Sequence, residues 1–417
     1  IVVSKVNKPG LMADIRYLPG KPKDLRDLNR NFPKTNQEPA AKDMPASALW
    51  ELLRVSKPDW FIDLHEGYDF HQINSDSVGS SIIDVKGKLA DAIVPKMLEV
   101  VNTTITDKRK KLVRLRYPVN GSIARAAYER LGAVSMILET TKKDQPISKR
   151  TRQHRIMVHT LLMHLGMVNK EAAHVLVPPK TEGLKIAVYD AGGVGVSGPQ
   201  NLDKVFADKK VILRRVGAVD IKAGILNQFD LVIFPGGSGS KQAAALQVEG
   251  REVVKKFINL GGGYVGICAG AYLAASNYQW SLGISNHKTF CESIDLPEIG
   301  RKSMWYRGAS APVKMELTEE GRRILGNVKG VFDVRYHNGP IMSDMGKEGV
   351  EPFRSLATFR SEVSRYKPQE GTMVNTPAII VGEFGKGRVL CISPHPESTV
   401  ELYGLVRNAA LWVAQKK

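Results

Sequence analysis

Short apolar runs alternate with helical patterns along the first 165 or so residues. Two buried strands are predicted where apolar residues cluster, and two helices where apolar residues recur at a spacing of three or four. These predicted elements cover residues 60–64, 89–97, 134–138 and 156–165. Strands that alternate with helices indicate a largely parallel or mixed sheet, covered by helices on both faces.

The same rhythm repeats more regularly after residue 183. Strands are predicted at residues 185–189, 211–216, 231–234 and 264–267, separated by helical or glycine-rich segments. This pattern is typical of a doubly wound, flavodoxin-like α/β sheet. In such sheets ligands bind beyond the carboxyl ends of the strands, so polar residues at those points are candidates for function.

The two patterns meet at residues 177–183, Val-Pro-Pro-Lys-Thr-Glu-Gly, where two prolines and a glycine interrupt the regular structure. We place a linker there, between predicted domains at residues 1–176 and 184–417. A chain of 417 residues is also too long for one ordinary core. The predicted fold class is therefore α/β with two domains, a mixed-sheet domain followed by a doubly wound one.

Composition narrows the choice of protein class. Hydrophobic residues make up 43% and charged residues 24% of the chain, and no apolar run approaches the roughly 20 residues that cross a bilayer. The three cysteines all lie in the second half, so no disulfide framework is expected. The net charge of +18 favours acidic partners. The densest basic stretches, residues 108–116 and 149–155, lack a nucleic-acid motif and are interpreted as solvated faces.

The chain begins Ile1-Val2-Val3, with neither an initiator methionine nor a signal peptide. This start resembles the middle of a strand, and we expect either a processed precursor or a fragment. On that basis an exported protein is favoured over a cytoplasmic one. The sequence leaves the compartment and the oligomeric state open.

The first candidate site begins with Asp-Leu-Asn-Arg-Asn-Phe-Pro at residues 27–33. The guanidinium of Arg30 can bind a carboxylate through two hydrogen bonds, and the neighbouring amide of Asn29 can donate to the same group. A surface turn is the alternative.

His65 and Glu139 each follow a predicted buried strand, and a histidine ligand with a glutamate base is what metal-assisted hydrolysis requires. Either residue alone would more often be structural.

These residues resemble the zinc metallocarboxypeptidase family, including its succinylglutamate desuccinylase and aspartoacylase branch, over roughly residues 1–165. The resemblance implies that Asn29 and Arg30 bind the substrate carboxylate and that Arg16 polarises the scissile carbonyl. It also implies that His65 is a zinc ligand and Glu139 the catalytic base. The implied cofactor is zinc.

The sequence departs from that family at the metal site. The family's first two zinc ligands come from a His-x-x-Glu segment upstream of the Asn-Arg pair, and residues 1–28 contain no histidine. His65 alone cannot supply the usual three protein ligands. We expect the missing ligands in a segment upstream of Ile1, and a zinc-free relative is the alternative.

The second candidate site centres on Gly266-Ile267-Cys268-Ala269-Gly270, between a predicted strand and a predicted helix. Small residues around a nucleophile permit the strained strand-to-helix turn that exposes its side chain above a sheet. The start of the following helix is expected to favour the thiolate. A buried structural thiol is the alternative.

Two further segments complete this pattern. The glycine-rich loop at residues 234–239 follows a strand, and its backbone N–H groups can stabilise an oxyanion. Downstream, a strand at residues 389–393 leads into Pro394-His395-Pro396-Glu397. Cys268 as nucleophile, His395 as base and Glu397 as orienting carboxylate satisfy the logic of a catalytic triad. A glycine turn and a Pro-His-Pro loop are the structural alternatives.

Together these segments resemble the class I glutamine amidotransferase fold over about residues 184–417. The branch at the N-terminus of some biotin-protein ligases is the most similar, and Tyr-His-Asn-Gly-Pro at residues 336–340 also resembles it. The resemblance implies a triad of Cys268, His395 and Glu397. It further implies that the N–H groups of Gly237 and Ala269 form the oxyanion hole.

We therefore expect a two-domain amide or peptide hydrolase. The first domain would be a zinc carboxypeptidase or deacylase, and the second would act through a thioester. The sequence shows no phosphate-binding loop or other ATP site, which favours hydrolysis over ammonia transfer to a synthetase. The expected partner is a peptide or acylated amino acid, with an acidic one favoured by the positive charge. A binding or scaffold protein with one or both sites inactive is the alternative.

Overall fold

The fold is described from a computed structural model. The structure describes residues 1–34, 41–105, 107–145, 147–168, 183–207, 210–297, 300–302, 310–364 and 370–415. The chain divides into two compact units, Ile1–Asn102 with Asp107–Met167 and Thr103–Thr106 with Val168–Lys417. Apart from Gly183, the linker predicted at residues 177–183 lies outside the described residues. The predicted limits of the two domains therefore stay predictions.

The first unit contains a mixed four-stranded sheet with the order β1-β4-β2-β3. Its strands are β1 (Trp60–Gly67), β2 (Ser81–Asp84), β3 (Val113–Leu115) and β4 (Val134–Thr141). β4 pairs in parallel with β1 and antiparallel with β2, and β2 pairs in parallel with β3. A mixed sheet was expected from the sequence. Both predicted strands are present, but each extends three residues beyond its predicted end.

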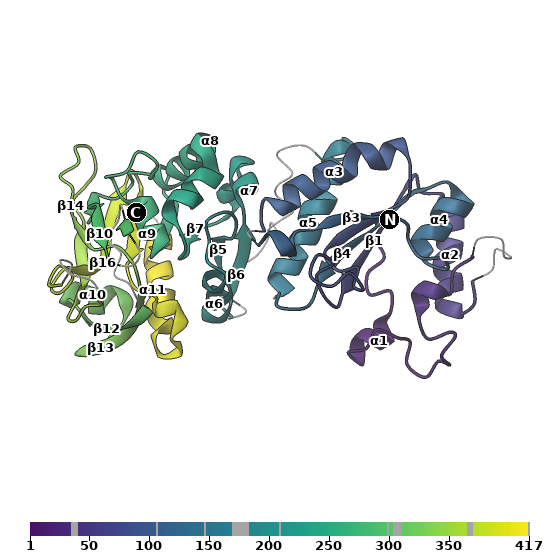
Figure 1. The fold of residues 1–417 in the computed structure, drawn as a ribbon, viewed down its shortest axis with the longest axis horizontal. Coiled ribbons are helices and arrows are strands. Elements are labelled where there is room, and N and C mark those ends of the chain that lie inside the picture. The colour runs from purple at the N-terminus through teal and green to yellow at the C-terminus, as the bar shows by residue number, and fades with distance from the viewer. Residues whose placement is uncertain are drawn as a thin grey trace. The chain divides into compact units, whose positions relative to one another are not determined.

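Helices cover both faces of this sheet (Figure 1). The helices of the first unit are α1 (Lys8–Met12), α2 (Met44–Ser56), α3 (Lys88–Asn102), α4 (Ile123–Leu131) and α5 (Ile147–His164). α3 and α5 pack against each other, while α4 packs on β4 and β1 with α2 behind it. Ile137 of β4 packs against Ala124 of α4. Successive side chains of a strand point to opposite faces, so residues 137 and 139 share a face. Glu139 therefore lies on the α4 face.

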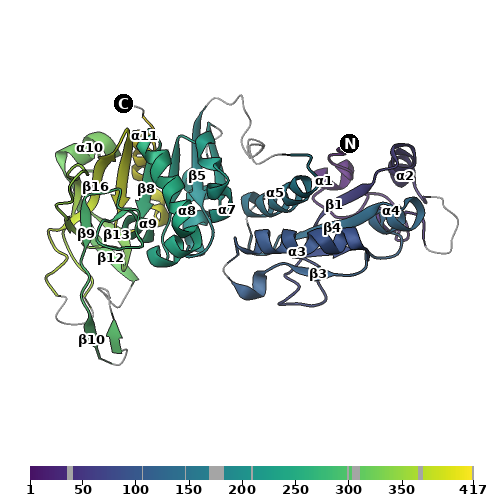
Figure 2. The ribbon, with the colours of Figure 1, turned by 90° about the horizontal axis from the view of Figure 1, so that it is seen from above.

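The second unit contains a nine-stranded mixed sheet with the order β13-β12-β15-β16-β17-β8-β7-β5-β6. Its strands are β5 (Leu184–Tyr189), β6 (Val211–Val216), β7 (Leu231–Phe234), β8 (Gly263–Ile267), β12 (Ser310–Leu317), β13 (Val331–His337), β15 (Arg354–Phe359), β16 (Pro377–Phe384) and β17 (Gly387–Ile392). Two smaller pairs are β9 (His287–Thr289) with β14 (Met342–Asp344) and β10 (Ile294–Leu296) with β11 (Gly300–Lys302). The β10–β11 hairpin extends away from the large sheet (Figure 2).

The doubly wound pattern predicted from the sequence describes only part of this sheet. The five strands from β6 to β17 are parallel, whereas β16, β15, β12 and β13 continue it in antiparallel fashion. The helices of this unit are α6 (Ser197–Val205), α7 (Ala218–Lys222), α8 (Gly239–Asn259), α9 (Ala269–Ala274), α10 (Glu319–Leu325) and α11 (Tyr403–Ala414). α7 packs on α8, and α11 packs on α6 and α10.

An aromatic stack joins three of the parallel strands. Phe234 of β7 lies between Tyr189 of β5 and Tyr264 of β8, with ring centroids 4.8 and 5.5 Å apart. All three rings are fully buried. The Tyr264 hydroxyl donates a hydrogen bond of 2.7 Å to the carbonyl of Gly270, so its polar end is satisfied. The stack thereby fixes the position of the turn that carries Cys268.

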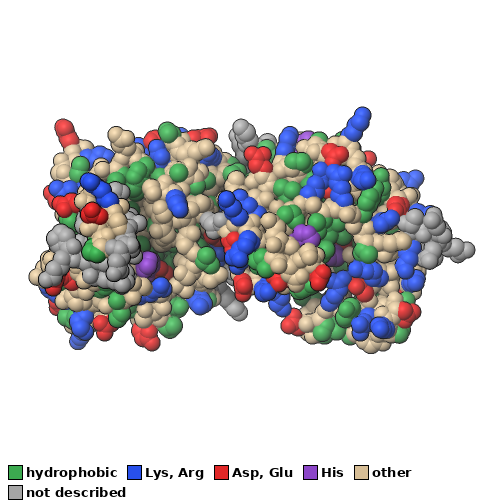
Figure 3. Space-filling view, in the orientation of Figure 1, with side chains coloured by type: hydrophobic (Ala, Val, Ile, Leu, Met, Phe, Trp, Pro, Cys, Tyr) green, Lys and Arg blue, Asp and Glu red, His purple; other side chains and the backbone are tan. Residues whose placement is uncertain are grey.

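Charged side chains of both signs are mixed on the visible face of the first unit, instead of forming one basic tract (Figure 3). Within the basic stretch at residues 108–116, Arg114 pairs with the buried Asp84 and with Asp91. Part of the positive charge is therefore neutralised inside the unit. None of the helices in the described parts of the chain is long and apolar enough to span a bilayer.

We expect Phe234→Ala to lower the free energy of unfolding by about 3 kcal/mol or more, because it leaves a cavity between two buried rings. Leu411→Ala, on the exposed side of α11, serves as the control and should change it by less than about 0.5 kcal/mol. Urea denaturation of both variants provides the comparison. Equal effects would show that the stack is not part of the core on which stability depends.

Candidate functional site

Cys268 occupies a strained turn between β8 and α9. Its backbone has φ 51° and ψ −99°, a region that residues with a side chain rarely adopt. The Cys268 N–H donates to the Ile392 carbonyl at the end of β17 (2.8 Å), and its own carbonyl accepts from Ala271 and Tyr272 (3.0 and 3.2 Å). These bonds hold the strained backbone in place.

Close backbone approaches explain the two glycines that flank Cys268. A Cβ on Gly266 would lie 2.5 Å from the carbonyl oxygen of Gly270, and a Cβ on Gly270 would lie 2.0 Å from that of Phe234. No side chain fits at either position. Gly266 is therefore required by the turn itself, and Gly270 by the packing of the turn against β7.

The structure places His395 and Glu397 beside this turn, just after β17. The Nδ1 atom of His395 lies 2.8 Å from Oε1 of Glu397, whose side chain is almost fully buried. Burial acts to lower the pKa of His395. The charge of Cys268 and a hydrogen bond to it, together with Glu397, outweigh burial and raise that pKa to about 10. The arrangement therefore favours an imidazolium next to the sulfur.

The predicted oxyanion donors lie on the same side of the sheet. The loop after β7 is held by hydrogen bonds from Gly195 to Gly236 (2.8 Å) and from Ser238 to Gly193 (2.7 Å). The N–H groups of Gly237 and Ala269 donate no hydrogen bond to any described residue, so they are available to a ligand. A Cβ on Gly236 would come within 2.7 Å of Cε1 of His395. This glycine, to which the sequence analysis gave no role, leaves room for the imidazole.

The free edge of β13 contributes backbone groups that the sequence analysis did not identify. The carbonyl of Arg335 accepts a hydrogen bond from the His395 N–H (2.7 Å), and that of His337 accepts from Sγ of Cys268 (3.6 Å). Carbonyls two residues apart in a strand point to the same side. From the sequence, residues 336–340 show only a family resemblance, because residue types do not reveal a role played by the backbone.

In the first unit, His65 and Glu139 lie opposite each other on β1 and β4. The sequence placed them after the ends of their strands; both are in fact inside the strands, because each strand runs on by three residues. His65 Nδ1 is 3.9 Å from Oε1 of Glu139, and its Nε2 is 2.8 Å from Oδ2 of Asp63. The sequence analysis gave Asp63 no role. Because side chains alternate along a strand, residues 63 and 65 share a face, and this spacing could have identified Asp63 as a partner of His65.

Burial dominates the electrostatics of this pair. It raises the pKa of Glu139 to about 7, against the opposing effect of the charges of His65 and Arg16. For His65, burial acts to lower the pKa, but the hydrogen bond and charge of Asp63 and the charge of Glu139 raise it overall. Arg16 acts on both groups, so the structure brings Arg16, His65 and Glu139 into one electrostatic cluster.

The predicted carboxylate clamp is organised by local hydrogen bonds. The side-chain oxygen of Asn29 accepts from the N–H of Ile123 at the start of α4 (3.0 Å), which leaves the amide NH₂ to donate. Nη1 of Arg30 donates to the carbonyl of Asn29 (2.7 Å), and Arg16 pairs with Asp27 (3.1 Å). Within the described residues, no hydrogen bond or ion pair connects this clamp to the His65–Glu139 pair.

The described residues do not by themselves fit a zinc site. They include no group of three or more His, Cys, Asp or Glu side chains that could hold a metal ion. Both ring nitrogens of His65 already face carboxylates. The expected zinc would therefore depend on ligands that the described residues do not supply.

Comparison with solved structures gives distant similarities. A structure described as a glutamine amidotransferase is 21% identical, with 55% of this chain and 98% of that chain covered and a TM-score of 0.36. A glutamine amidotransferase from Thermotoga maritima is 12% identical, with 56% and 99% covered and the same TM-score. A cytoplasmic protein from Salmonella typhimurium is also 12% identical, with 56% and 100% covered and a TM-score of 0.36. These similarities are too distant to indicate an activity.

Sequence comparison is more specific for the second unit. No curated protein matches the chain. Residues 226–411 match a family model described as "Biotin-protein ligase, N terminal". The matched segment contains Cys268, His395 and Glu397. Residues 226–411 are therefore similar to the N-terminal domain of biotin-protein ligases.

Proposed function

We propose that the second unit is a cysteine-dependent amide hydrolase. The observation that carries this proposal is the position of Cys268, on a strained turn beside His395 and two N–H groups that donate to no described residue. A buried structural thiol would require neither the strain nor the carboxylate-supported imidazole. Strained backbone conformations persist where function requires them.

The reaction follows from these positions. The thiolate of Cys268 attacks the amide carbon, and the N–H groups of Gly237 and Ala269 stabilise the oxygen that becomes negative. His395 then donates its proton to the departing nitrogen as the C–N bond breaks, which leaves a thioester on Cys268. Water, deprotonated by His395, attacks the thioester and releases the acid. Glu397 orients the imidazole throughout.

For the first unit, we propose the carboxypeptidase or deacylase activity that the sequence resemblance implies. Glu139 supports it, because a carboxyl with a pKa of about 7 can both accept and donate a proton near neutral pH. The NH₂ of Asn29, which donates to no described residue, and the guanidinium of Arg30 would bind a substrate carboxylate. Zinc would supply a polarised water in this family's chemistry, and it requires ligands besides His65.

Hydrolysis of a simple amide tests the proposal for the second unit. We expect release of ammonia from glutamine or a related amide, reduced at least about a thousandfold by Cys268→Ser, because the nucleophile is lost. Cys291→Ser, which removes the exposed thiol, should leave the rate unchanged. An activity that survives Cys268→Ser would contradict the proposed nucleophile.

Alkylation tests the same site without a substrate. Cys291 is exposed, so labelling is best measured in the Cys291→Ser background. There iodoacetamide should modify Cys268 near neutral pH and spare Cys391, because burial raises the pKa of the Cys391 thiol. His395→Ala should slow labelling by about tenfold or more, and Glu397→Gln by less. Mass-spectrometric mapping gives the rates, and faster labelling of Cys391 would refute the triad.

The raised pKa of Glu139 predicts a pH-dependent stability. Between pH 4.5 and about 7 the folded state holds a proton that the unfolded state has released. Stability of the first unit should therefore fall by about 2–3 kcal/mol as the pH rises through that range. Glu139→Gln should remove most of the fall and leave the smaller part that comes from the raised pKa of His65, whereas Glu51→Gln, at an exposed position, should preserve the whole of it.

Hydrogen exchange of peptides from β4 at increasing urea concentrations, with a chelator present, measures this free energy at pH 5 and pH 8. A wild-type protein that is equally stable at both values would contradict the burial of a titrating Glu139.

A further inference from the structure

The loop at residues 235–238, after β7, carries the N–H of Gly237, one of the two proposed oxyanion donors. A Cβ on Gly236 would lie 2.7 Å from Cε1 of His395 and 3.7 Å from Cβ of Cys268, so the loop passes directly beside the base and the nucleophile. Peptide groups between glycines rotate with little steric resistance, because glycine lacks a Cβ. The direction of the Gly237 N–H must therefore be fixed by contacts from outside the loop.

The middle peptide group of the loop joins the carbonyl of Gly236 to the N–H of Gly237. In a planar trans peptide, the C=O and N–H bonds point in opposite directions. The Gly236 carbonyl accepts a hydrogen bond from the N–H of Gly195 (2.8 Å), so the Gly237 N–H is directed away from Gly195. This one bond therefore sets the direction of the oxyanion donor.

Gly195 belongs to the segment after β5, and this segment contacts the loop at a second point. The carbonyl of Gly193 accepts a hydrogen bond from the N–H of Ser238 (2.7 Å). A Cβ on Gly237 would lie 2.2 Å from that carbonyl oxygen, so the two backbones are in direct contact. The segment after β5 thus holds two successive peptide groups of the loop.

Gln242, in the first turn of α8, holds the peptide group before these two. Its side chain is fully buried, and its Nε2 donates to the carbonyl of Pro235 (2.8 Å). Its Oε1 has no hydrogen-bond partner among the described residues. A buried oxygen without a partner lowers stability, so an apolar side chain would serve better if only packing mattered. The hydrogen bond to the loop explains why a glutamine stands here.

We propose that Gly195 and Gln242 are positioning residues for the oxyanion hole, because they hold the loop that directs the N–H of Gly237. This inference rests on the proposed amide hydrolysis and extends the site to two elements outside the triad motifs, the segment after β5 and helix α8. Both residues act through the backbone of the loop. A donor that is already oriented stabilises the oxyanion without a cost of reorientation during the reaction.

Two reagents for Cys268 test this role, because only one of them passes through an oxyanion. With p-nitrophenyl acetate, Sγ adds to the carbonyl carbon, the carbonyl oxygen becomes negative, and p-nitrophenolate leaves as the thioester forms. With iodoacetamide, Sγ bonds to the methylene carbon with loss of iodide and no oxyanion. Both rates are measured in the Cys291→Ser background, which lacks the exposed thiol. Release of p-nitrophenolate is corrected for the rate that remains after Cys268→Ser.

Gln242→Met keeps the side-chain volume but loses the hydrogen bond to Pro235, and Gly195→Pro removes the N–H that holds Gly236. We expect each change to slow acylation of Cys268 by about tenfold or more and alkylation by less than about twofold, because an oxyanion donor is misdirected. Gly195→Ala keeps the N–H, and its Cβ would lie no closer than 3.4 Å to its neighbours. It should therefore retain the acylation rate that Gly195→Pro loses.

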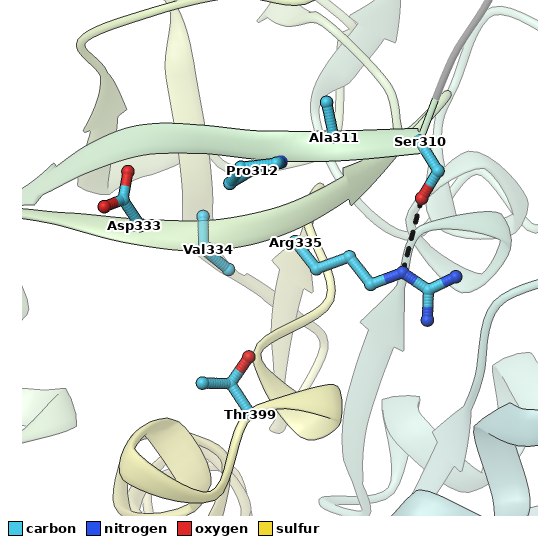
Figure 4. Close-up of a pocket in the computed structure, with 7 residues that line it drawn as sticks. All are labelled: Ser310, Ala311, Pro312, Asp333, Val334, Arg335 and Thr399. Atoms are coloured by element: carbon cyan, nitrogen blue, oxygen red, sulfur yellow. Dashed lines mark hydrogen bonds between the residues drawn. The ribbon is translucent and has the colours of Figure 1, made fainter.

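A control comes from the hollow of about 390 Å³ on β12 and β13. Figure 4 shows Asp333 and Arg335 on β13 there, with the side chain of Arg335 extending toward Ser310. Asp333 pairs with Lys314 (3.5 Å), while Arg335 has no counter-ion among the described residues and donates from Nε to Ser310 (3.4 Å). No hydrogen bond between described residues joins these side chains to the loop. Asp333→Asn should therefore change both rates by less than about twofold.

The outcomes separate the positioning role from the proposed function. If Gln242→Met and Gly195→Pro acylate as fast as the parent protein, the positioning role is wrong while the proposed hydrolysis stands. If acylation and alkylation slow equally, the changes disturb the whole Cys268 turn, and the positioning role is again wrong. If p-nitrophenyl acetate does not acylate Cys268 in the parent protein, the proposed hydrolysis fails and this inference fails with it. Gln242→Met decides the outcome if Gly195→Pro does not fold.

Discussion

The hydrogen bond from the backbone N–H of Cys268 to the carbonyl of Ile392 connects the two halves of the candidate triad. Cys268 follows β8 and His395 follows β17, and the parallel pairing of these strands continues through this bond into the turn. The positive φ of Cys268 is strained by itself. The bond, the glycine contacts with β7 and the buried aromatic stack together hold that strain in place.

Charged and hydrogen-bonding groups around the Cys268 turn determine the protonation of His395. Glu397 is buried against the imidazole of His395, which interacts with the thiol of Cys268, and the carbonyl of His337 accepts a hydrogen bond from that thiol. These contacts favour the protonated imidazolium of His395 beside the sulfur, because the pKa of His395 is raised to about 10.

In the first unit, burial has the largest effect on the pKa of the candidate base, Glu139. Burial raises the pKa of Glu139 to about 7, and the charges of His65 and Arg16 oppose this effect without removing it. A proton-transfer group is thus created by desolvation. The clamp residues Asn29 and Arg30 are positioned separately, by the cap on α4. The metal that the family resemblance implies would have to draw on ligands besides these.

The sequence by itself determined the elements whose signals are local. Apolar runs located β1, β4, β5, β6, β7 and β8, and the glycines around Cys268 indicated the sharp turn, because only glycine fits such close backbone approaches. The order Cys268, His395, Glu397 also followed from residue types after strands. The family match over residues 226–411 agrees with the resemblance that these motifs carried.

Only the tertiary structure decided which distant segments meet. The doubly wound pattern did not predict the antiparallel strands β12, β13, β15 and β16. Strand pairing depends on contacts between distant segments, which local hydrophobicity does not encode. The carbonyls of Arg335 and His337 reach the triad through their backbone, and every residue type has that same backbone. Burial of Glu139 and the lack of a counter-ion for Arg335 among the described residues likewise depend on neighbours far away in the chain.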